Sequence, residues 1–188
     1  MEPYASVEDY RALTGKTDTS SDAQIYIDLS AISRYLDGKL GRYFCRDASD
    51  TTRLYLPESA ITTLYIEDVV SVTEVALESG DYYEAITDYL LLPLNADKQP
   101  EPRPFTSIRL RNSTFPADYQ VRVTGIHGWP AIPDAVQRAT LHLAAILRIE
   151  SPRATRRVSE LGDAIETSDD AMSIVRQLTD RYRRVSYV

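Results

Sequence analysis

The chain has 188 residues, of which 43% are hydrophobic and 26% charged, and its formal net charge is −7. This balance is typical of a folded globular domain with room for an inserted lobe, and it excludes a disordered chain. The longest apolar runs, such as residues 90–92, fall far short of the roughly 18 residues of a membrane span. The first residues lack the features of a signal peptide, and the single cysteine, Cys45, excludes an internal disulfide. We therefore expect a protein made in a cytoplasm, with no membrane partner.

The charge is unevenly distributed along the chain. Residues 1–100 carry 8 Lys and Arg against 18 Asp and Glu, whereas residues 101–188 carry 13 against 10. The acidic first part disfavours nucleic-acid binding, which depends on neutralising phosphates. Of the 21 cationic residues 18 are Arg, which suits bidentate contacts to carboxylates at protein interfaces. An Arg-rich genome explains the same bias equally well.

The first 41 residues predict two helices. Ser6 and Asp9 have the spacing of a capping box and begin a short helix that ends near Gly15. A longer helix follows the polar cluster at residues 19–22 and ends at Gly41. Its apolar residues recur every three or four positions and form one face of a helix: Ile25, Leu29, Ile32, Leu36 and Leu40.

Residues 52–126 have the composition of β-strands, with abundant Tyr, Val, Ile and Thr. Three prolines in residues 95–104 predict a loop or the tip of a long hairpin. Alternation of apolar and polar residues predicts strands at 53–56, 62–66, 70–77, 82–92, 107–110 and 119–124.

The last third of the chain predicts two more helices. The first begins at Pro133 and ends near Ile149, and it is apolar on nearly all sides. Such a helix is buried in a core or in a subunit interface. After a polar linker at residues 151–168, a final helix begins at Asp169 and the chain ends in an extended tail. The narrow polar stripe of the earlier helix comprises Asp134, Arg138 and His142, and the final helix aligns Met172, Val175, Leu178 and Tyr182 on one face.

The sequence contains no pattern that indicates catalysis or metal binding. His127, His142 and Cys45 are too far apart to suggest a ligand cluster or a nucleophile with its base, and no phosphate-binding loop is present. We interpret His127 as a turn or packing residue, and acidic pairs such as Glu67–Asp68 as solvated turns. We therefore expect no enzyme, no metal and no cofactor.

Tyrosine dominates the aromatic residues, with 13 Tyr against 3 Phe. Tyr and Arg are enriched at the energetic centres of protein interfaces, although Tyr is also common in ordinary strands. For residues 182–188 the interface interpretation is favoured, because an extended terminus either binds something or frays. We also expect that deleting these residues leaves the rest of the chain folded.

Short motifs along most of the chain resemble the head–tail connector (adaptor) proteins of long-tailed bacteriophages and phage-like gene-transfer particles. The matching segments are residues 4–15, residues 21–44, residues 121–139 and residues 159–184. About 75 residues separate the second and third helices, where a minimal adaptor has a short loop. Larger members of the family carry a β-lobe there, so the resemblance implies an inserted antiparallel sheet or small barrel.

The resemblance implies an α+β fold, in which an antiparallel bundle of about four helices carries the inserted β-lobe and an extended C-terminal tail. The expected parts are residues 1–50 (N-terminal helices of the bundle), 51–127 (β-lobe), 128–150 (third bundle helix) and 151–188 (linker, C-terminal helix and portal-binding tail).

The function that the resemblance implies is structural. It implies a subunit of a ring of twelve copies in the neck of the virion, beneath the portal protein, with a stopper or tail terminator protein on its other side. DNA passes through only as cargo. The expected portal-binding residues are Arg181, Tyr182, Arg183, Arg184, Val185, Tyr187 and Val188. The expected inter-subunit residues are Ile25, Leu29, Ile32, Leu36, Arg138 and His142.

Two alternatives remain open. One is another neck or tail component, such as a stopper or tail-completion protein, and those proteins have more sheet and less helix. The other is a small DNA-packaging protein that binds nucleic acid, against which the acidic first half argues. A hydrolase is a more remote possibility.

Overall fold

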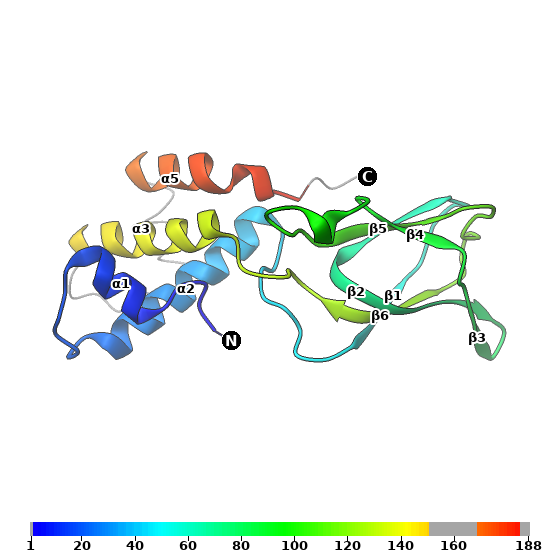
Figure 1. Ribbon diagram of the computed structural model, residues 1–188, viewed down its shortest axis with the longest axis horizontal. Helices are drawn as coiled ribbons and strands as arrows, with labels where there is room; N and C mark the ends of the chain where they lie inside the picture. The colour runs from blue at the N-terminus through cyan, green and yellow to red at the C-terminus, as the bar shows by residue number, and fades with distance from the viewer. Residues whose placement is uncertain (1, 151–168, 185–188) are drawn as a thin grey trace. The chain divides into compact units, whose positions relative to one another are not determined.

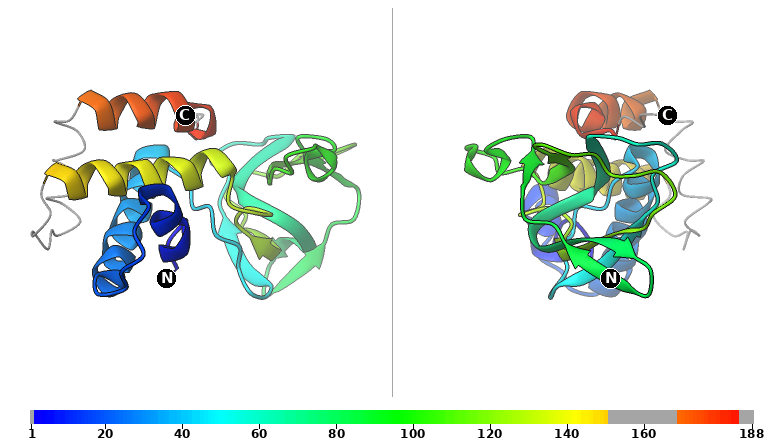
Figure 2. Two further views of the ribbon diagram at one scale, coloured as in Figure 1. Left: turned by 60° about the vertical axis from the view of Figure 1, so that its left-hand side comes forward. Right: turned by 90° about the vertical axis from the view of Figure 1, so that its right-hand side faces the viewer.

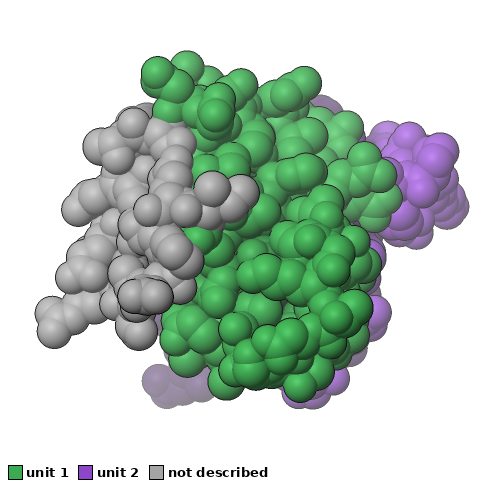
Figure 3. Space-filling model, turned by 90° about the vertical axis from the view of Figure 1, so that its left-hand side faces the viewer, with its two compact units in different colours: residues 1–42, 132–188 green, residues 43–131 purple. Residues whose placement is uncertain are grey.

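The computed structural model describes residues 2–150 and 169–184 (Figure 1). The chain divides into two compact units, which Figure 3 colours separately. Residues 1–42 and 132–188 make up the helical unit, and residues 43–131 make up the β unit. The β unit is therefore an insertion between the second and third helices. Within the described ranges, no helix has the length and apolar character needed to cross a membrane.

The described part of the helical unit contains four α-helices and a short 3-10 helix. α3 contacts each of the other three α-helices, and α5 lies along it (Figure 2). The capping box predicted at Ser6 and Asp9 is present. Gly41 ends α2 with a positive φ of 63°, a conformation that glycine adopts without steric cost. The elements are α1 (Val7–Thr14), α2 (Asp22–Leu40), α3 (Asp134–Glu150), α5 (Asp169–Thr179) and η2 (Asp180–Tyr182).

The core of the helical unit is built on the apolar face that the sequence predicts for α2. The five side chains of that face, Ile25, Leu29, Ile32, Leu36 and Leu40, are at most 2% exposed. Full burial of such a side chain stabilises a fold by about 1.5–3 kcal/mol. Hydrogen bonds connect other segments to α2. The backbone N–H of Tyr4 donates to Ser33 Oγ at 2.9 Å, and Arg148 of α3 donates to Asp28 at 2.6 Å.

The β unit is a six-stranded antiparallel sheet that curves around its own core (Figure 2). The strand order is β1-β6-β2-β5-β4, with β3 paired to β2. A 3-10 helix, η1 (Ala96–Lys98), lies in the predicted loop after β4. The strands are β1 (Thr51–Tyr55), β2 (Thr63–Ser79), β3 (Tyr82–Ala85), β4 (Tyr89–Leu92), β5 (Phe105–Leu110) and β6 (Val121–His127). Their core comprises Leu64, Ile66, Val69, Val75, Ile108, Leu110, Phe115, Val121 and Val123.

β2 differs from the prediction, because it is one strand of 17 residues where the sequence predicts two. Its register against β5 and β6 shifts, so the strand bends without ending. Glu67 and Asp68 lie within the strand, and each has a partner. Glu67 forms an ion pair with Arg53, and the carboxylate of Asp68 accepts a hydrogen bond from Trp129 Nε1 at 2.9 Å. The interpretation of this acidic pair as a solvated turn is wrong. At residues 82–92 the sequence predicts one strand, whereas the structure has two, β3 and β4.

Contacts between the two ends of the β unit extend it beyond the expected range of 51–127. The rings of Phe44 and Trp129 lie 5.1 Å apart, and the backbone N–H of Trp129 donates to the carbonyl of Cys45. Gly128 allows this approach, because a Cβ there would lie 1.8 Å from the Cys45 oxygen. Its φ of +101° also disfavours any residue with a side chain.

Candidate interaction surfaces

The last turn of the helical unit contains four of the residues expected to bind a portal. Arg181 and Arg183 are exposed and Arg184 is half-buried. Tyr182 is only 2% exposed, and the guanidinium of Arg181 stacks on its ring at 4.6 Å. Tyr182 is therefore part of the core of its own unit, which corrects the expectation that it contacts a partner. Its burial also argues against a separable tail that begins at residue 182. The other three expected residues, Val185, Tyr187 and Val188, lie outside the described residues.

The segment that ends at Arg184 lies against the C-terminal end of α2. The backbone N–H of Arg184 donates to the carbonyl of Leu40 at 2.8 Å. That carbonyl belongs to the last turn of the helix, whose carbonyl groups lack partners within the helix itself. A Cβ at Gly41 would lie 3.6 Å from Arg184 Cβ, so the two segments lie close together. Arg184 is thus held beside the end of α2.

The residues expected at subunit contacts fall into two groups. Ile25, Leu29, Ile32 and Leu36 are at most 1% exposed within the chain itself. The structure places these four side chains in the core of the helical unit, so they are not available to a neighbouring subunit. The remaining two, Arg138 and His142, are exposed, as is Asp134 on the same stripe of α3.

The helical unit also presents apolar side chains that sequence reasoning did not single out. Leu13, Tyr26 and Ile27 are each between 45% and 48% exposed. Tyr26 lines a surface groove of about 610 Å³ between the N-terminal segment and the first turns of α2. The groove is also lined by the carboxylates of Glu2, Glu8, Asp9 and Asp22.

The β unit carries most of the excess negative charge, with 7 Lys and Arg against 13 Asp and Glu. One polar stack crosses the outer face of its sheet. The guanidinium of Arg122 lies 4.4 Å from the centre of the Tyr83 ring and donates to Glu74 at 3.0 Å. The Tyr83 hydroxyl donates to Gln120 at 2.7 Å. Leu54 and Leu56, on the neighbouring strand and just after it, are 57% and 60% exposed.

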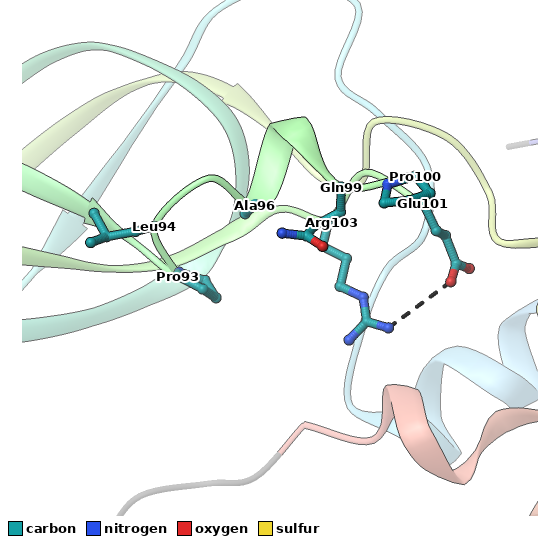
Figure 4. A pocket seen from close by; sticks show the side chains of 7 residues that line it. All are labelled: Pro93, Leu94, Ala96, Gln99, Pro100, Glu101 and Arg103. Atoms are coloured by element: carbon teal, nitrogen blue, oxygen red, sulfur yellow. Dashed lines mark ion pairs between the residues drawn. The ribbon is translucent and has the colours of Figure 1, made fainter.

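A second hollow lies within the loop that follows β4 (Figure 4). It measures about 480 Å³, and its lining includes Pro93, Leu94, Gln99 and Arg103. The charged groups of Glu101 and Arg103 on it are 4.0 Å apart, and these side chains are 40% and 50% exposed. An open hollow of this composition offers no set of converging polar groups of the kind that holds a small ligand.

His127 is a buried titratable group of the β unit. It is 1% exposed, and burial together with the nearby Arg53 lowers its pKa. Thr51 Oγ1 donates to Asp47 at 2.7 Å, so the contact of 3.1 Å between Thr51 Oγ1 and His127 Nδ1 requires the proton on Nδ1. Nε2 is then a buried acceptor without a hydrogen-bond partner. The interpretation of His127 as a packing residue agrees with this burial.

None of these groups assembles into a recognisable catalytic centre. Among the described residues, no three His, Cys, Asp or Glu side chains lie together in a way that could hold a metal ion. His142 is exposed on α3 and Cys45 is half-buried in the β unit.

Comparison with known proteins gives a likeness in fold. No protein-family model matches the chain, and no curated protein matches it. A chain in the neck of an empty GTA particle, computed with C6 symmetry, has a similar structure with a TM-score of 0.58 and 16% sequence identity. A chain in the virion of a native gene transfer agent (GTA) particle has a TM-score of 0.50 and 17% identity. Each similarity covers 98% of this chain and 92% of the other. The fold of this chain is thus similar, over nearly its whole length, to that of a chain found in the neck of a phage-like particle.

Proposed function

We propose that this chain is a structural adaptor in the neck of a phage-like particle. Its copies form a ring beneath the portal protein, extend the DNA channel and receive the tail. The observation that carries the proposal is the likeness to a neck chain across 98% of the sequence, β unit included. The adaptor assignment predicts helices with an inserted β-lobe, and the described residues contain four α-helices and a six-stranded antiparallel sheet inserted between α2 and α3.

In the proposed ring the helical units pack side by side. A ring with more than two members needs two different surfaces that fit each other. The exposed residues Tyr26 and Ile27 on α2 and Arg138 and His142 on α3 supply candidates for these surfaces. A ring of twelve copies contains sixfold symmetry, so the C6 symmetry of the similar neck is compatible with twelve.

In the same proposal, attachment to the portal uses the C-terminal end of the chain. Arg181, Arg183 and Arg184 contribute cations, and residues 185–188 continue from Arg184, which lies beside the end of α2. On this proposal residues 185–188 bind as an extended peptide, and such peptides commonly add a strand to an exposed sheet edge. The tail-side surface binds a stopper or a tail terminator protein, and DNA passes through without a specific site.

A stopper or tail-completion protein is the main alternative within the neck. The described residues contain four α-helices and one sheet. This share of helix favours an adaptor over a stopper or tail-completion protein, which has more sheet and less helix. A DNA-packaging protein is disfavoured by the net charge of −7.

Electron microscopy of particles from the same genome tests the proposal. We expect a ring of this chain, with twelve copies, in direct contact with the portal. When residues 185–188 are deleted from this chain, heads and portals should assemble normally, but the shortened chain should not join them. A single copy per particle, or a position away from the portal, would falsify the assignment.

A further inference from the structure

The outward side of the first half of α2 carries no charged side chain. Its residues follow the spacing i, i+3, i+4 and i+7, which places them on one side of a helix. Tyr26 and Ile27 are 46% and 48% exposed. The next residue on this side, Arg34, forms an ion pair with Asp37 at 3.1 Å. We call the four uncharged residues of this side the α2 face: Ala23, Tyr26, Ile27 and Ser30.

The α2 face differs from the outward sides of the neighbouring helices. A helix side that faces water ordinarily carries charged residues. The outward side of α5 includes Asp170 and Arg176. The outward side of α3, here called the α3 stripe, comprises three exposed residues: Asp134, Arg138 and His142. The centre of a protein interface is depleted of charge and enriched in Tyr, so the composition of the α2 face indicates a surface that another protein covers.

The α2 face and the α3 stripe point away from each other. α2 and α3 pack against each other within the helical unit (Figure 2). Their buried sides include Leu29 and Ile32 on α2 and Val136 and Leu143 on α3, all of them 0% exposed. Because these buried sides meet in one core, the outward sides lie on opposite sides of the unit. A closed ring needs two such surfaces on each copy, since one surface of a copy meets the other surface of the next.

The surroundings of Tyr26 favour a cation over an anion. Tyr26 borders the groove at the first turns of α2, and the described residues that line this groove include four carboxylates but no Lys or Arg. Glu8 and Asp22 each pair with Arg11, at 3.5 and 3.3 Å. Glu2 is exposed, and its side chain has no partner within the described residues. An aromatic ring and an exposed carboxylate on one groove suit a guanidinium, which stacks on the ring and pairs with the carboxylate.

We propose that the α2 face of one copy binds the α3 stripe of the next copy, head to tail around the ring, with Arg138 seated on Tyr26 and close to Glu2. The inference rests on the proposed function, which supplies the ring, and its new content is the pairing of these two surfaces. Arg138 is exposed and forms no ion pair with any residue that the structure describes. It therefore binds a neighbouring copy without giving up a contact within its own chain.

The first test is thiol cross-linking in assembled particles. Ile27→Cys and His142→Cys are combined in a chain that also carries Cys45→Ala, and the particles are treated with a short bis-maleimide. Each copy then has one thiol on each surface, so a head-to-tail ring should give a ladder of covalent dimers, trimers and larger oligomers. Chains with Ile27→Cys alone or His142→Cys alone should give no such ladder.

The second test is the uptake of purified full-length variants by portal-bearing heads that lack the adaptor. Arg138→Glu should lower the number of copies bound by at least about tenfold, because it places a carboxylate against the acidic groove. Adding Glu2→Arg to this variant should restore part of the loss. The matched control is Arg176→Glu, an equal change of charge at an exposed arginine of α5 that has no ion pair among the described residues, and its uptake should be normal.

The outcomes separate the pairing from the proposed function. Cross-linking that stops at dimers would indicate a two-fold contact, and cross-links to another particle protein would assign the α2 face to that protein; either result overturns the inference. Equal losses of uptake in Arg138→Glu and Arg176→Glu would also overturn it. Rings seen by electron microscopy without cross-links between copies would overturn the inference and leave the proposed function intact. Particles whose neck lacks this chain would contradict the proposed function itself.

Discussion

At the scale of single residues, buried polar groups connect segments of the β unit that are distant in the sequence. Asp68 holds the indole of Trp129, and His127 is fixed by Thr51 through one ring nitrogen. Neither pairing has a local signal in the sequence, because the partners are 61 and 76 residues apart. The sequence does suggest that His127 is a packing residue, from its place next to glycines. It cannot reveal which group His127 contacts.

His127 makes the stability of the β unit sensitive to pH. Burial and the charge of Arg53 lower its pKa in the folded state, whereas an unfolded histidine titrates near 6.5. The unfolded chain therefore binds more protons in mildly acidic solution, so the free energy of unfolding should decrease as the pH falls below about 6.5. The chain has a single tryptophan, and Trp129 is buried in this unit, so its fluorescence during urea unfolding reports the effect.

The control for this prediction is a pair of histidine substitutions. Measurements between about pH 8 and pH 5.5 stay above the range in which most carboxylates titrate. Burial raises the pKa of Asp37 in the helical unit, and its contribution has the opposite sign, since it favours folding as the pH falls. His127→Gln should flatten the pH dependence of the tryptophan signal, whereas His142→Gln should not. An unchanged slope in His127→Gln would show that another group is responsible.

At the scale of secondary structure, helices were easier to predict than strands. The spacing of Ile25, Leu29 and Ile32 indicates α2 and its buried face, because helical periodicity is local. The interpretation of that face as a subunit contact does not hold, since periodicity shows which face is apolar but not what covers it. The predicted strand boundaries are wrong where pairing with neighbouring strands determines them. β2, for example, continues through Glu67 and Asp68.

The final helix illustrates a second limit. Tyr182 continues the apolar face of α5, yet the helix ends at Thr179 and a turn of 3-10 helix follows. Sequence reasoning grouped Tyr182 with the exposed arginines around it. In the structure it packs inside the unit while Arg181 and Arg183 face outward. The folded part of the helical unit therefore includes Tyr182 and extends at least to Arg184.

This difference leads to a prediction about stability. Tyr182→Ala should destabilise the helical unit by roughly 3 kcal/mol, because it removes a buried aromatic ring and leaves a cavity. Arg183→Ala, at the exposed neighbouring position, should change stability by less than about 0.5 kcal/mol. Helical circular dichroism during urea unfolding measures both. If Tyr182→Ala is as stable as Arg183→Ala, the ring does not belong to the core.

At the scale of the whole molecule, the sequence indicates the mixed α/β composition and the long insertion, but not the surfaces that the fold creates. The backbone N–H of Arg184 donates to the carbonyl of Leu40, and no sequence pattern predicts that the segment after η2 returns to the end of α2. The sequence shows the charge imbalance of the first hundred residues. The structure assigns most of it to the β unit, whereas the helical unit is nearly neutral, with 14 cations against 15 carboxylates.

The acidic β unit leads to the last prediction, which concerns the passage of DNA. If this unit faces the channel of the proposed ring, its negative charge keeps the genome from adhering to the wall. Glu58→Lys, Asp81→Lys and Glu84→Lys, three changes at exposed positions, would convert 7 cations and 13 carboxylates into 10 of each. Particles with this triple variant should assemble normally but release DNA more slowly, as measured by dye fluorescence after ejection is triggered. The neutral triple variant Glu58→Gln, Asp81→Asn and Glu84→Gln should lie in between, because it removes three charges without adding any. Unchanged ejection in both variants would place these carboxylates on the outer rim of the ring, away from the DNA.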